Sequence, residues 1–309
     1  MKIAFLGTPD FAIPSLNMLY ESGHALQVFT QPDRPAGRRG TLTPPVTKTF
    51  ARMRGIPVSQ FERIRNPDGI AALTAFAPDL MVTAAFGQLL SAEALAVPRY
   101  GCINVHGSLL PKYRGAAPIQ WAVINGETIT GITTMFTDIG MDTGDILLTD
   151  AVAILPDETA GELYARLSEL GAHTLMRTIE ALTDGTLKRI PQDNAKATKC
   201  VMLKKEHGRL SFTDTAQQTH NRVRGTNPWP GAYALLDGEP LKIWKTRLSN
   251  RLDLPKRAPG TCTVLRQDKL MVHCADEPLE ILELQSPGGK RQDAAAFLRG
   301  HAVDGSLLT

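Results

Sequence analysis

The chain has 309 residues, with 34 Lys and Arg against 31 Asp and Glu, and therefore a formal net charge of +3 at pH 7. Hydrophobic residues make up 43% and charged residues 21%, and the mean hydropathy of -0.12 is ordinary for a water-soluble globular protein. This composition excludes a disordered chain, and the length predicts two folding units. No apolar run approaches the ~18 residues of a membrane span, and a cytoplasmic protein is expected.

The first part of the chain predicts alternating strands and helices. Residues 2–7 form a short apolar run ending in glycine, and residues 11–23 have apolar residues at helical spacing. Pro9 and Asp10 interrupt the apolar start too early for a secretory signal. Further strands are expected from the apolar runs at residues 25–29, 79–86, 102–105, 131–136 and 146–154. With a long amphipathic helix at 159–182, residues 1–188 predict a Rossmann-like, mostly parallel α/β sheet domain.

After Gly185 the pattern changes. Residues 189–206 are polar, basic and without periodicity, which is typical of a linker. Short alternating segments then follow between Gly, Pro and Asp turns, at residues 232–236, 241–245, 261–265, 269–273 and 279–284. This spacing predicts a smaller C-terminal β-barrel domain, OB-like, over residues 207–309.

Charge is unevenly distributed between these two parts. Residues 1–188 have 15 Lys and Arg against 18 Asp and Glu, whereas residues 189–309 have 19 against 13. Residues 34–54 hold six basic side chains and no acidic one. The asymmetry favours a polyanionic partner, with an ordinary solvated surface as the alternative that charge alone leaves open. The four cysteines are widely scattered, so neither a disulfide framework nor a zinc site is expected.

Polar side chains that directly follow strands mark the expected ligand edge of such a sheet. Asn104 and His106 are two residues apart at the end of a predicted strand and therefore project to the same face. The loop that follows, Ser108-Leu109-Leu110-Pro111, suits a flat heterocycle. A hydrogen-bonded structural histidine is the alternative for His106. The first strand ends in GTPDFA without the G-x-G-x-x-G spacing, which argues against a dinucleotide-binding dehydrogenase.

Residues 137–146, TDIGMDTGDI, place three carboxylates in a short loop after another predicted strand. Calcium loops need denser oxygen ligands and a closing glutamate, which this segment lacks. A turn explains Asp138 and Asp145. Asp142 is the candidate for a site carboxylate that orients His106 or moves a proton.

The motifs resemble those of the formyltransferases that use 10-formyltetrahydrofolate. The resemblance rests on the N-x-H pair followed by SLLPKYRG, on TDIGMDTGDI and on the opening FLGTPDFA. It implies a catalytic trio of Asn104, His106 and Asp142, 10-formyltetrahydrofolate as co-substrate and no metal. It also implies folate contacts from Ser108, Leu109, Leu110, Pro111, Phe86 and Gln88.

Two further segments are similar to the branch of that family whose acceptor is initiator methionyl-tRNA: QPDRPAGRRGTLTPPV at 31–46 and HNRVRGTNPWPGAY at 220–233. This similarity implies contacts to the acceptor stem from Arg38, Arg39, Lys48, Arg222 and Arg224. A monomer without an obligate protein partner is expected. The alternatives within the family are a formyltransferase for a sugar-nucleotide amine and a formyltetrahydrofolate hydrolase. A non-catalytic RNA-binding protein is disfavoured because Asn104, His106 and Asp142 are all present.

Overall fold

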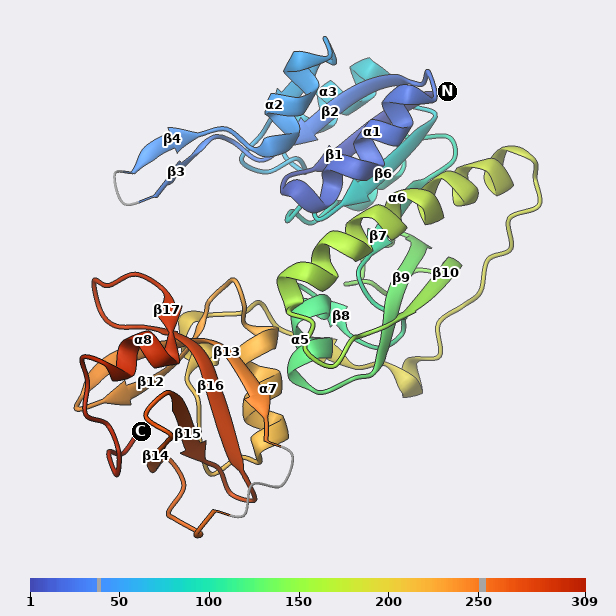
Figure 1. Ribbon diagram of the computed structural model, residues 1–309. Coiled ribbons are helices and arrows are strands. Elements are labelled where there is room, and N and C mark those ends of the chain that lie inside the picture. The colour runs from blue at the N-terminus through green and yellow to red at the C-terminus, as the bar shows by residue number, and fades with distance from the viewer. Residues whose placement is uncertain (38–39, 250–253) are drawn as a thin grey trace. The chain divides into compact units, whose positions relative to one another are not determined.

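The computed structural model describes residues 1–37, 40–249 and 254–309 (Figure 1). The chain separates into two compact units, each built from several stretches of sequence. The first unit comprises residues 1–115, 130–152 and 164–199, and the second comprises residues 116–129, 153–163 and 200–309. Residues 116–129 and 153–163 therefore belong to the same unit as the C-terminal residues.

The first unit is built around a seven-stranded sheet of order β10-β9-β7-β6-β1-β2-β5. Its strands are β1 (Lys2–Gly7), β2 (Ala25–Thr30), β5 (Val58–Gln60), β6 (Leu80–Ala84), β7 (Cys102–His106), β9 (Ile129–Phe136) and β10 (Ile146–Ala153). β1 pairs in parallel with β2 and β6, and β7 pairs in parallel with β6. β9 runs antiparallel to β7. The expectation of a mostly parallel α/β sheet is confirmed.

Helices cover this sheet because its strands are apolar on both faces. They are α1 (Ile13–Glu21), α2 (Val46–Met53), α3 (Pro67–Phe76), α4 (Ala92–Leu95) and α6 (Ala160–Thr183), with a 3-10 turn η1 (Asp10–Ala12) before α1. Leu6 and Met81 share a buried cluster with Leu73 of α3 and Ala94 of α4. On α6, Gly171 allows close packing, since a Cβ there would lie 2.8 Å from Val105 Cγ1. A hairpin of β3 (Arg34–Ala36) and β4 (Thr41–Thr43) extends from this unit in Figure 1.

The second unit contains an antiparallel sheet of order β12-β13-β16-β15-β14, with β17 paired to β16. Its strands are β12 (Ala232–Leu236), β13 (Glu239–Leu248), β14 (Cys262–Leu265), β15 (Lys269–His273), β16 (Pro278–Gln285) and β17 (Gln292–Asp293). Leu270, Ile281 and Phe297 belong to its core. The expected C-terminal β domain is therefore present as an antiparallel sheet.

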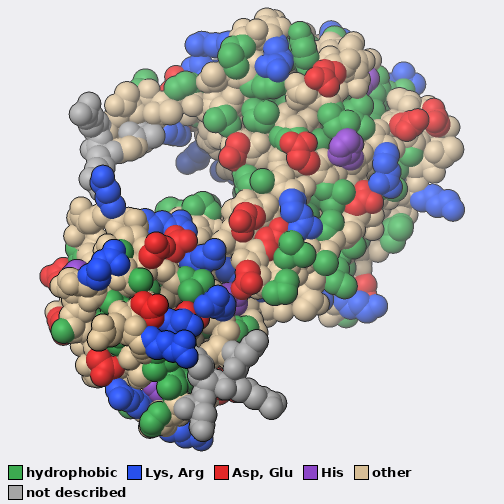
Figure 2. Space-filling view, in the orientation of Figure 1, with side chains coloured by type: hydrophobic (Ala, Val, Ile, Leu, Met, Phe, Trp, Pro, Cys, Tyr) green, Lys and Arg blue, Asp and Glu red, His purple; other side chains and the backbone are tan. Residues whose placement is uncertain are grey.

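Three helices belong to this second unit: α5 (Pro118–Ile124), α7 (Ala216–Gly225) and α8 (Ala294–Leu298). α5 and α7 pack closely where Gly225 meets Ile124, because a Cβ on Gly225 would lie 2.5 Å from Ile124 Cγ1. On the visible face of this unit, Lys and Arg side chains are interspersed with Asp and Glu (Figure 2). No helix of the described residues has the length and hydropathy that a membrane span requires.

The segment after α6 has defined local structure. Ile190 pairs with Ile146 of β10 through two backbone hydrogen bonds of 2.8 and 2.9 Å. A 3-10 turn η2 (Asn194–Lys196) follows, then β11 (Lys199–Cys200), which pairs with β8 (Arg114–Gly115), and a second turn η3 (Lys205–Gly208). Residues 189–199 of the segment that the sequence marks as a linker therefore belong to the first unit, and residues 200–206 belong to the second.

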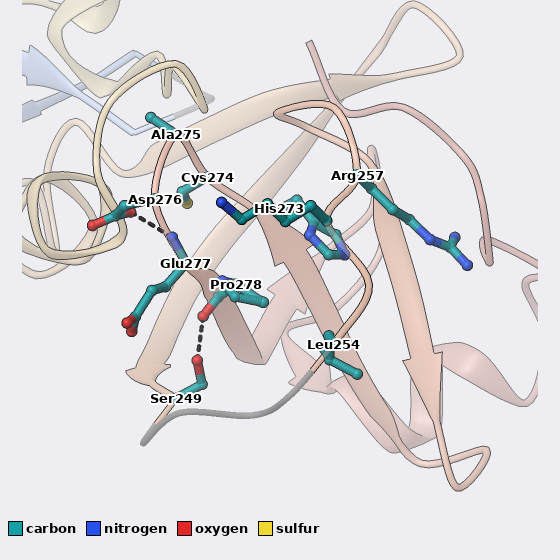
Figure 3. A pocket seen from close by; sticks show the side chains of 10 residues that line it. Ser249, Leu254, Arg257, His273, Cys274, Ala275, Asp276, Glu277 and Pro278 are labelled. Carbon is teal, nitrogen blue, oxygen red and sulfur yellow. Dashed lines mark hydrogen bonds between the residues drawn. The ribbon is translucent and has the colours of Figure 1, made fainter.

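A surface cavity of about 420 Å³ lies on the second unit, between the ends of β13, β15 and β16 (Figure 3). His273 and Cys274 are its buried members. Its polar groups are largely engaged within the protein: Asp276 Oδ1 accepts from the Ala216 amide at 2.8 Å, and the Ser249 hydroxyl donates to the Pro278 carbonyl. None of the residues that line it belongs to the predicted catalytic trio.

Candidate active site

β7 presents Asn104 and His106 on one face of the sheet, as its two-residue period predicts. Asn104 is half-buried, and its Oδ1 accepts a hydrogen bond of 2.8 Å from the hydroxyl of Thr83 on the neighbouring strand β6. Because the hydroxyl donates to Oδ1, the amide is oriented with Nδ2 on the side away from Thr83. The donor end of the amide is thereby held in one direction.

His106 is 5% exposed at the carboxyl end of β7. Its Nε2 lies 3.0 Å from the Tyr113 carbonyl oxygen, which only accepts, so Nε2 carries the hydrogen of that bond. Nδ1 then faces Asp142, with 3.8 Å between Nδ1 and Oδ2. This separation is too long for a direct hydrogen bond but brings an imidazole and a carboxylate together at the sheet edge.

Asp142 is held in the loop between β9 and β10 by a backbone contact. Its Oδ2 accepts the amide hydrogen of Gly115 at 2.7 Å. The residue has φ of +54°, in the left-handed region that few non-glycine residues adopt. Such strained positions persist only where neighbouring contacts hold them, and they concentrate at functional sites.

The other two carboxylates of this loop have structural roles. Asp138 Oδ1 accepts hydrogen bonds from the Gly140 amide at 3.0 Å and the Thr143 hydroxyl at 2.7 Å, which closes a turn. Asp145 pairs with Arg189 at 2.9 Å. Gly144 packs tightly against β9, since a Cβ there would lie 1.7 Å from the Phe136 carbonyl oxygen. Of the three, only Asp142 faces His106.

The loop of residues 108–111 is fixed from within. The Ser108 hydroxyl donates to the Lys112 carbonyl at 2.6 Å, and the Thr133 hydroxyl donates to the Ser108 carbonyl at 2.7 Å. Thr133 Oγ1 also accepts the Leu110 amide hydrogen at 3.1 Å. Ser108 and Leu110 are buried, whereas Leu109 and Pro111 are half-buried, and the Leu110–Pro111 peptide is cis.

The two remaining predicted folate residues, Phe86 and Gln88, follow β6 at the same edge. Phe86 is 5% exposed and belongs to the core cluster of the first unit. Both ends of the Gln88 amide have protein partners: Oε1 accepts the Ile64 amide hydrogen at 2.6 Å, and Nε2 donates to the Phe61 carbonyl at 2.9 Å. Gln88 therefore ties residues 61–64 to this edge.

The cations predicted to contact RNA have different surroundings. Arg38 and Arg39 lie outside the described residues. Lys48 is buried, with its Nζ 2.7 Å from both carboxylate oxygens of Asp33, and these contacts lower the pKa of that carboxyl. Arg222 is half-buried and donates to the His207 carbonyl at 3.3 Å. Arg224 is 7% exposed, and burial lowers the pKa of its guanidinium.

Arg224 is held by polar groups of its own unit. It donates to Asn221 Oδ1 at 2.9 Å and to the carbonyls of Leu155 and Glu158 at 3.4 and 3.2 Å. Lys48 and Arg224 are thus both engaged by protein acceptors.

Several groups that hold the predicted site residues in place were not themselves predicted from the sequence. They are the Thr83 hydroxyl, the Tyr113 carbonyl, the Gly115 amide and the side chain of Gln192. Tyr113 and Gly115 belong to the SLLPKYRG motif, which is the signal that marks them. Gln192 lies in the segment read as a linker, where no hydrophobic periodicity draws attention to it.

The assembled groups suit polar chemistry at a carbonyl carbon. An amide Nδ2 and an imidazole Nδ1 lie on one strand face, and a carboxylate stands beside the imidazole. The amide N–H so placed stabilises negative charge on an oxygen, as the imidazole does when Nδ1 is protonated, and the carboxylate accepts a proton. Among the described residues, no group of three or more His, Cys, Asp and Glu is arranged to hold a metal ion.

Comparison with known families matches both parts of the chain. Residues 1–179 match the family described as "Formyl transferase", and residues 202–302 match "Formyl transferase, C-terminal domain". A methionyl-tRNA formyltransferase of Ruminiclostridium cellulolyticum is 46% identical over 305 residues, which cover 98% of each chain. One of Geobacter metallireducens is 48% identical over 301 residues, covering 97% of this chain and 96% of the relative.

Solved structures with the same fold are more distant in sequence. WlaRD, a sugar 3N-formyl transferase crystallised with dTDP and 5-N-formyl-THF, has a TM-score of 0.69 at 19% identity, with 91% of this chain and 97% of that chain covered. HypX from Aquifex aeolicus in complex with tetrahydrofolic acid has a TM-score of 0.66 at 17% identity, with 100% of this chain and 50% of that chain covered. These two structures support the fold.

Proposed function

The chain belongs to the formyl transferase family and, over its full length, to the methionyl-tRNA formyltransferases, and on this premise we propose that Asn104, His106 and Asp142 carry the reaction. The reaction transfers the formyl group of 10-formyltetrahydrofolate to the α-amino group of initiator methionyl-tRNA. The observation that supports the proposal is the approach of Asp142 Oδ2 to His106 Nδ1 at 3.8 Å, although 36 residues separate them.

Folate supplies the formyl carbon when it is bound. The groups at the carboxyl edge fit it: half-buried Leu109 and Pro111 offer apolar surface, and Asn104 offers an amide donor beside them along the chain. The acceptor amine titrates near pH ~8, so part of it is unprotonated at neutral pH and needs position more than activation. Holding the reactants is therefore the first task of these residues.

Asn104 and His106 act on the negative charge that develops on the formyl oxygen during attack. The Thr83 hydroxyl directs Nδ2 of Asn104 away from Oδ1, which makes it a preorganised donor. His106 donates from Nδ1 only when the ring is protonated there, because Nε2 already donates to the Tyr113 carbonyl. Each such donor contributes about 3 kcal/mol to transition-state stabilisation.

Asp142 has its role in the transfer of the proton that the attacking amine loses. Its carboxylate stands beside Nδ1 of His106, with 3.8 Å between Oδ2 and Nδ1. It is also the group placed to accept the proton that the attacking amine loses and to pass it toward the departing nitrogen. The Gly115 amide hydrogen on Oδ2 keeps the carboxylate in this place.

Three alanine substitutions test the trio. Asn104→Ala, His106→Ala and Asp142→Ala should each lower kcat by about a hundredfold or more, with an unchanged Kd for methionyl-tRNA. Single-turnover formylation of radiolabelled methionyl initiator tRNA gives the rate, and filter binding gives Kd. Asp184→Ala, at an exposed carboxylate after α6, serves as the control. A variant that keeps near-normal kcat removes its residue from the trio.

The same assay tests the acceptor. Glycinamide ribonucleotide and a sugar-nucleotide amine are offered in competition with methionyl initiator tRNA. We expect formyl transfer to the tRNA alone, and release of formate without an acceptor would indicate the hydrolase instead.

The basic segment of residues 34–48 is proposed to contact the acceptor stem of the tRNA. Arg38 and Arg39 supply the cations for phosphates and unpaired base edges. Lys48 is paired with Asp33 and supports the base of the hairpin. Arg224 is bound to Asn221 and supports the second unit. Arg222 has a longer hydrogen bond within the protein, 3.3 Å to the His207 carbonyl. The arginines of the segment thus carry the direct contacts.

Salt dependence tests this RNA contact. Binding of methionyl initiator tRNA should weaken steeply as salt rises, and Arg38→Ala/Arg39→Ala should flatten the slope of log K against log salt by about 1–2, since each phosphate contact contributes about 0.9. Arg63→Ala/Arg65→Ala removes the same charge from exposed positions elsewhere in the unit and should leave the slope unchanged. Equal slopes for the two double variants would contradict the proposal.

We also propose a cytoplasmic monomer. His106 and Asp142 approach each other within one chain, so the site as proposed needs no residue from a second copy. The family's role in translation initiation supports the location. Light scattering during size-exclusion chromatography measures the mass in solution.

A further inference from the structure

The segment after α6 fastens the loop that carries Asp142. Arg189 pairs with Asp145 at 2.9 Å, and its guanidinium lies 4.8 Å from the Phe136 ring centroid. Ile190 pairs with Ile146 through two backbone hydrogen bonds. These contacts hold a polar, aperiodic stretch of chain against residues 136–146.

Gln192 makes the contact nearest to Asp142 itself. Its Nε2 donates to the Asp142 carbonyl at 2.9 Å and to the Gly144 carbonyl at 2.7 Å. Both N–H groups of the amide are thereby used on two carbonyls of one loop. Because Asp142 has φ of +54°, its backbone needs such support to keep its conformation.

The other end of the same amide binds Arg114. Gln192 Oε1 accepts from Arg114 Nε at 3.0 Å and from Arg114 Nη2 at 2.8 Å. Arg114 is 6% exposed and also donates to Asn194 Oδ1 at 2.9 Å. The residue after Arg114, Gly115, donates its amide hydrogen to the Asp142 carboxylate.

We propose that Gln192 is a positioning residue for the formyl transfer, which fixes the Asp142 carboxylate beside His106 by clamping the Asp142 loop to Arg114. The inference rests on the proposed role of Asp142. Gln192 contacts the loop that carries this carboxylate and the guanidinium of Arg114. The residue after Arg114, Gly115, donates its amide hydrogen to the same carboxylate. The segment thus contributes to catalysis through geometry.

Position 192 needs a side chain that donates on one side and accepts on the other, and glutamine does both. The loop side presents two carbonyl oxygens and needs two donors, whereas the Arg114 side presents two N–H groups and needs an acceptor. A primary amide offers both at its two ends. Glutamate offers only the acceptor, and methionine of similar length offers neither.

This difference gives two informative variants. Gln192→Glu keeps the partner of Arg114 and places oxygen against two carbonyls. Gln192→Met removes the hydrogen bonds to Asp142, Gly144 and Arg114. Both should lower kcat by about tenfold or more, because a displacement of about 1 Å at a reacting group has effects of that size or larger. The Kd for methionyl-tRNA and KM for the folate should stay within about twofold. Asn194→Ala loses a bond to Arg114 alone and should keep normal kcat.

A double-mutant cycle with Asp142→Ala separates positioning from general stability. If Gln192 acts through Asp142, Gln192→Glu should cost less than about twofold in kcat when Asp142 is already alanine. A purely structural residue would cost the same factor in both backgrounds. Single-turnover assays at excess enzyme measure these slow rates.

The outcomes distinguish the two proposals. Loss of activity in Asp142→Ala together with normal kcat in Gln192→Glu overturns the clamp and leaves the proposed function standing. Normal kcat in Asp142→Ala overturns the role of Asp142 and the clamp with it. Equal costs of Gln192→Glu in both backgrounds also overturn the clamp. If Gln192→Met does not fold, Gln192→Glu retains the Arg114 partner and decides the matter.

Discussion

At the residue scale, the candidate site depends on hydrogen bonds that orient the side chains proposed to be catalytic. The Asn104 side-chain amide has two possible orientations, which exchange the positions of its accepting oxygen and its donating nitrogen. The Thr83 hydroxyl fixes one of them by donating to Oδ1. His106 has its tautomer set by the Tyr113 carbonyl. Tyr113 has φ of +60° and Asp142 of +54°, so the two residues that flank the imidazole both occupy the left-handed region.

Thr83→Val is a sharp test of the first of these bonds, because valine preserves the shape of threonine in the 7% exposed position. Without the hydroxyl, the Asn104 amide gains a second orientation that turns Oδ1 toward the substrate. We expect kcat to fall about three- to tenfold, in line with a hydrogen bond of about 1 kcal/mol, and Thr83→Ser to keep most of it. Single-turnover rates decide, and an unaffected Thr83→Val would show that Asn104 is oriented by other contacts.

At the scale of elements, α7 is notable because it buries polar side chains. Thr219, His220, Asn221 and Arg224 are all buried on it. His220 shares a 2.9 Å hydrogen bond with the Thr246 hydroxyl of β13, and its Nε2 lies 3.3 Å from the Pro156 carbonyl. The helix therefore joins residues 153–163 to the antiparallel sheet by hydrogen bonds as well as by packing.

His220 gives this helix a pH dependence. Burial lowers the pKa of His220 below its usual 6.5 and Arg224 adds to this, while the Pro156 carbonyl and Asp157 oppose it. Below pH 6.5 the unfolded chain takes up a proton that the folded chain does not, so the free energy of unfolding falls as pH decreases, and this loss is absent above pH 6.5.

The measurement is the free energy of unfolding at pH 7.5 and 5.5 in urea. His220→Gln should reduce the difference between the two pH values, by at most about 1.4 kcal/mol, because pH 5.5 lies about one unit below the pKa of histidine in an unfolded chain. His173→Gln, at an exposed position on α6, should keep the wild-type difference. An unchanged difference in His220→Gln would mean that His220 is not the group that titrates.

At the scale of the whole molecule, each unit has a core that shields its reactive groups. All four cysteines are buried. Burial raises the pKa of Cys102 and Cys262 to about 12 and that of Cys274 to about 11. Thiolates are the reactive form, so folded protein at neutral pH presents almost none of these sulfurs to a reagent.

Thiol labelling therefore reports on the integrity of both units. Native protein at pH 8 should react with Ellman's reagent only slowly, and protein in denaturant should release four equivalents at once. Asp184→Cys, at an exposed position, should add one rapidly reacting thiol and serve as the control. A rapidly reacting thiol in the native wild type would contradict the burial described above.

The sequence alone determined the elements whose burial is apolar. The strands at 2–7, 25–30 and 232–236 and the long helix α6 agree with their predicted positions, because a covered strand or helix face leaves a hydrophobic period in the sequence. α7 left no such signal, since its buried face is polar. The direction of β9 was also not encoded in its apolar run, because strand direction is set by the connection and not by composition.

For the site, the two-residue period of β7 and the sequence motifs predicted Asn104, His106 and Asp142 as site residues. Only the tertiary structure shows which groups hold these side chains in place. His106 is bound by a main-chain carbonyl and Asp142 by a main-chain amide. Because nearly every residue has both groups, no pattern of side chains in the sequence predicts these contacts. Gln192 acquires its contacts only when a segment fifty residues downstream of Asp142 folds back along the loop.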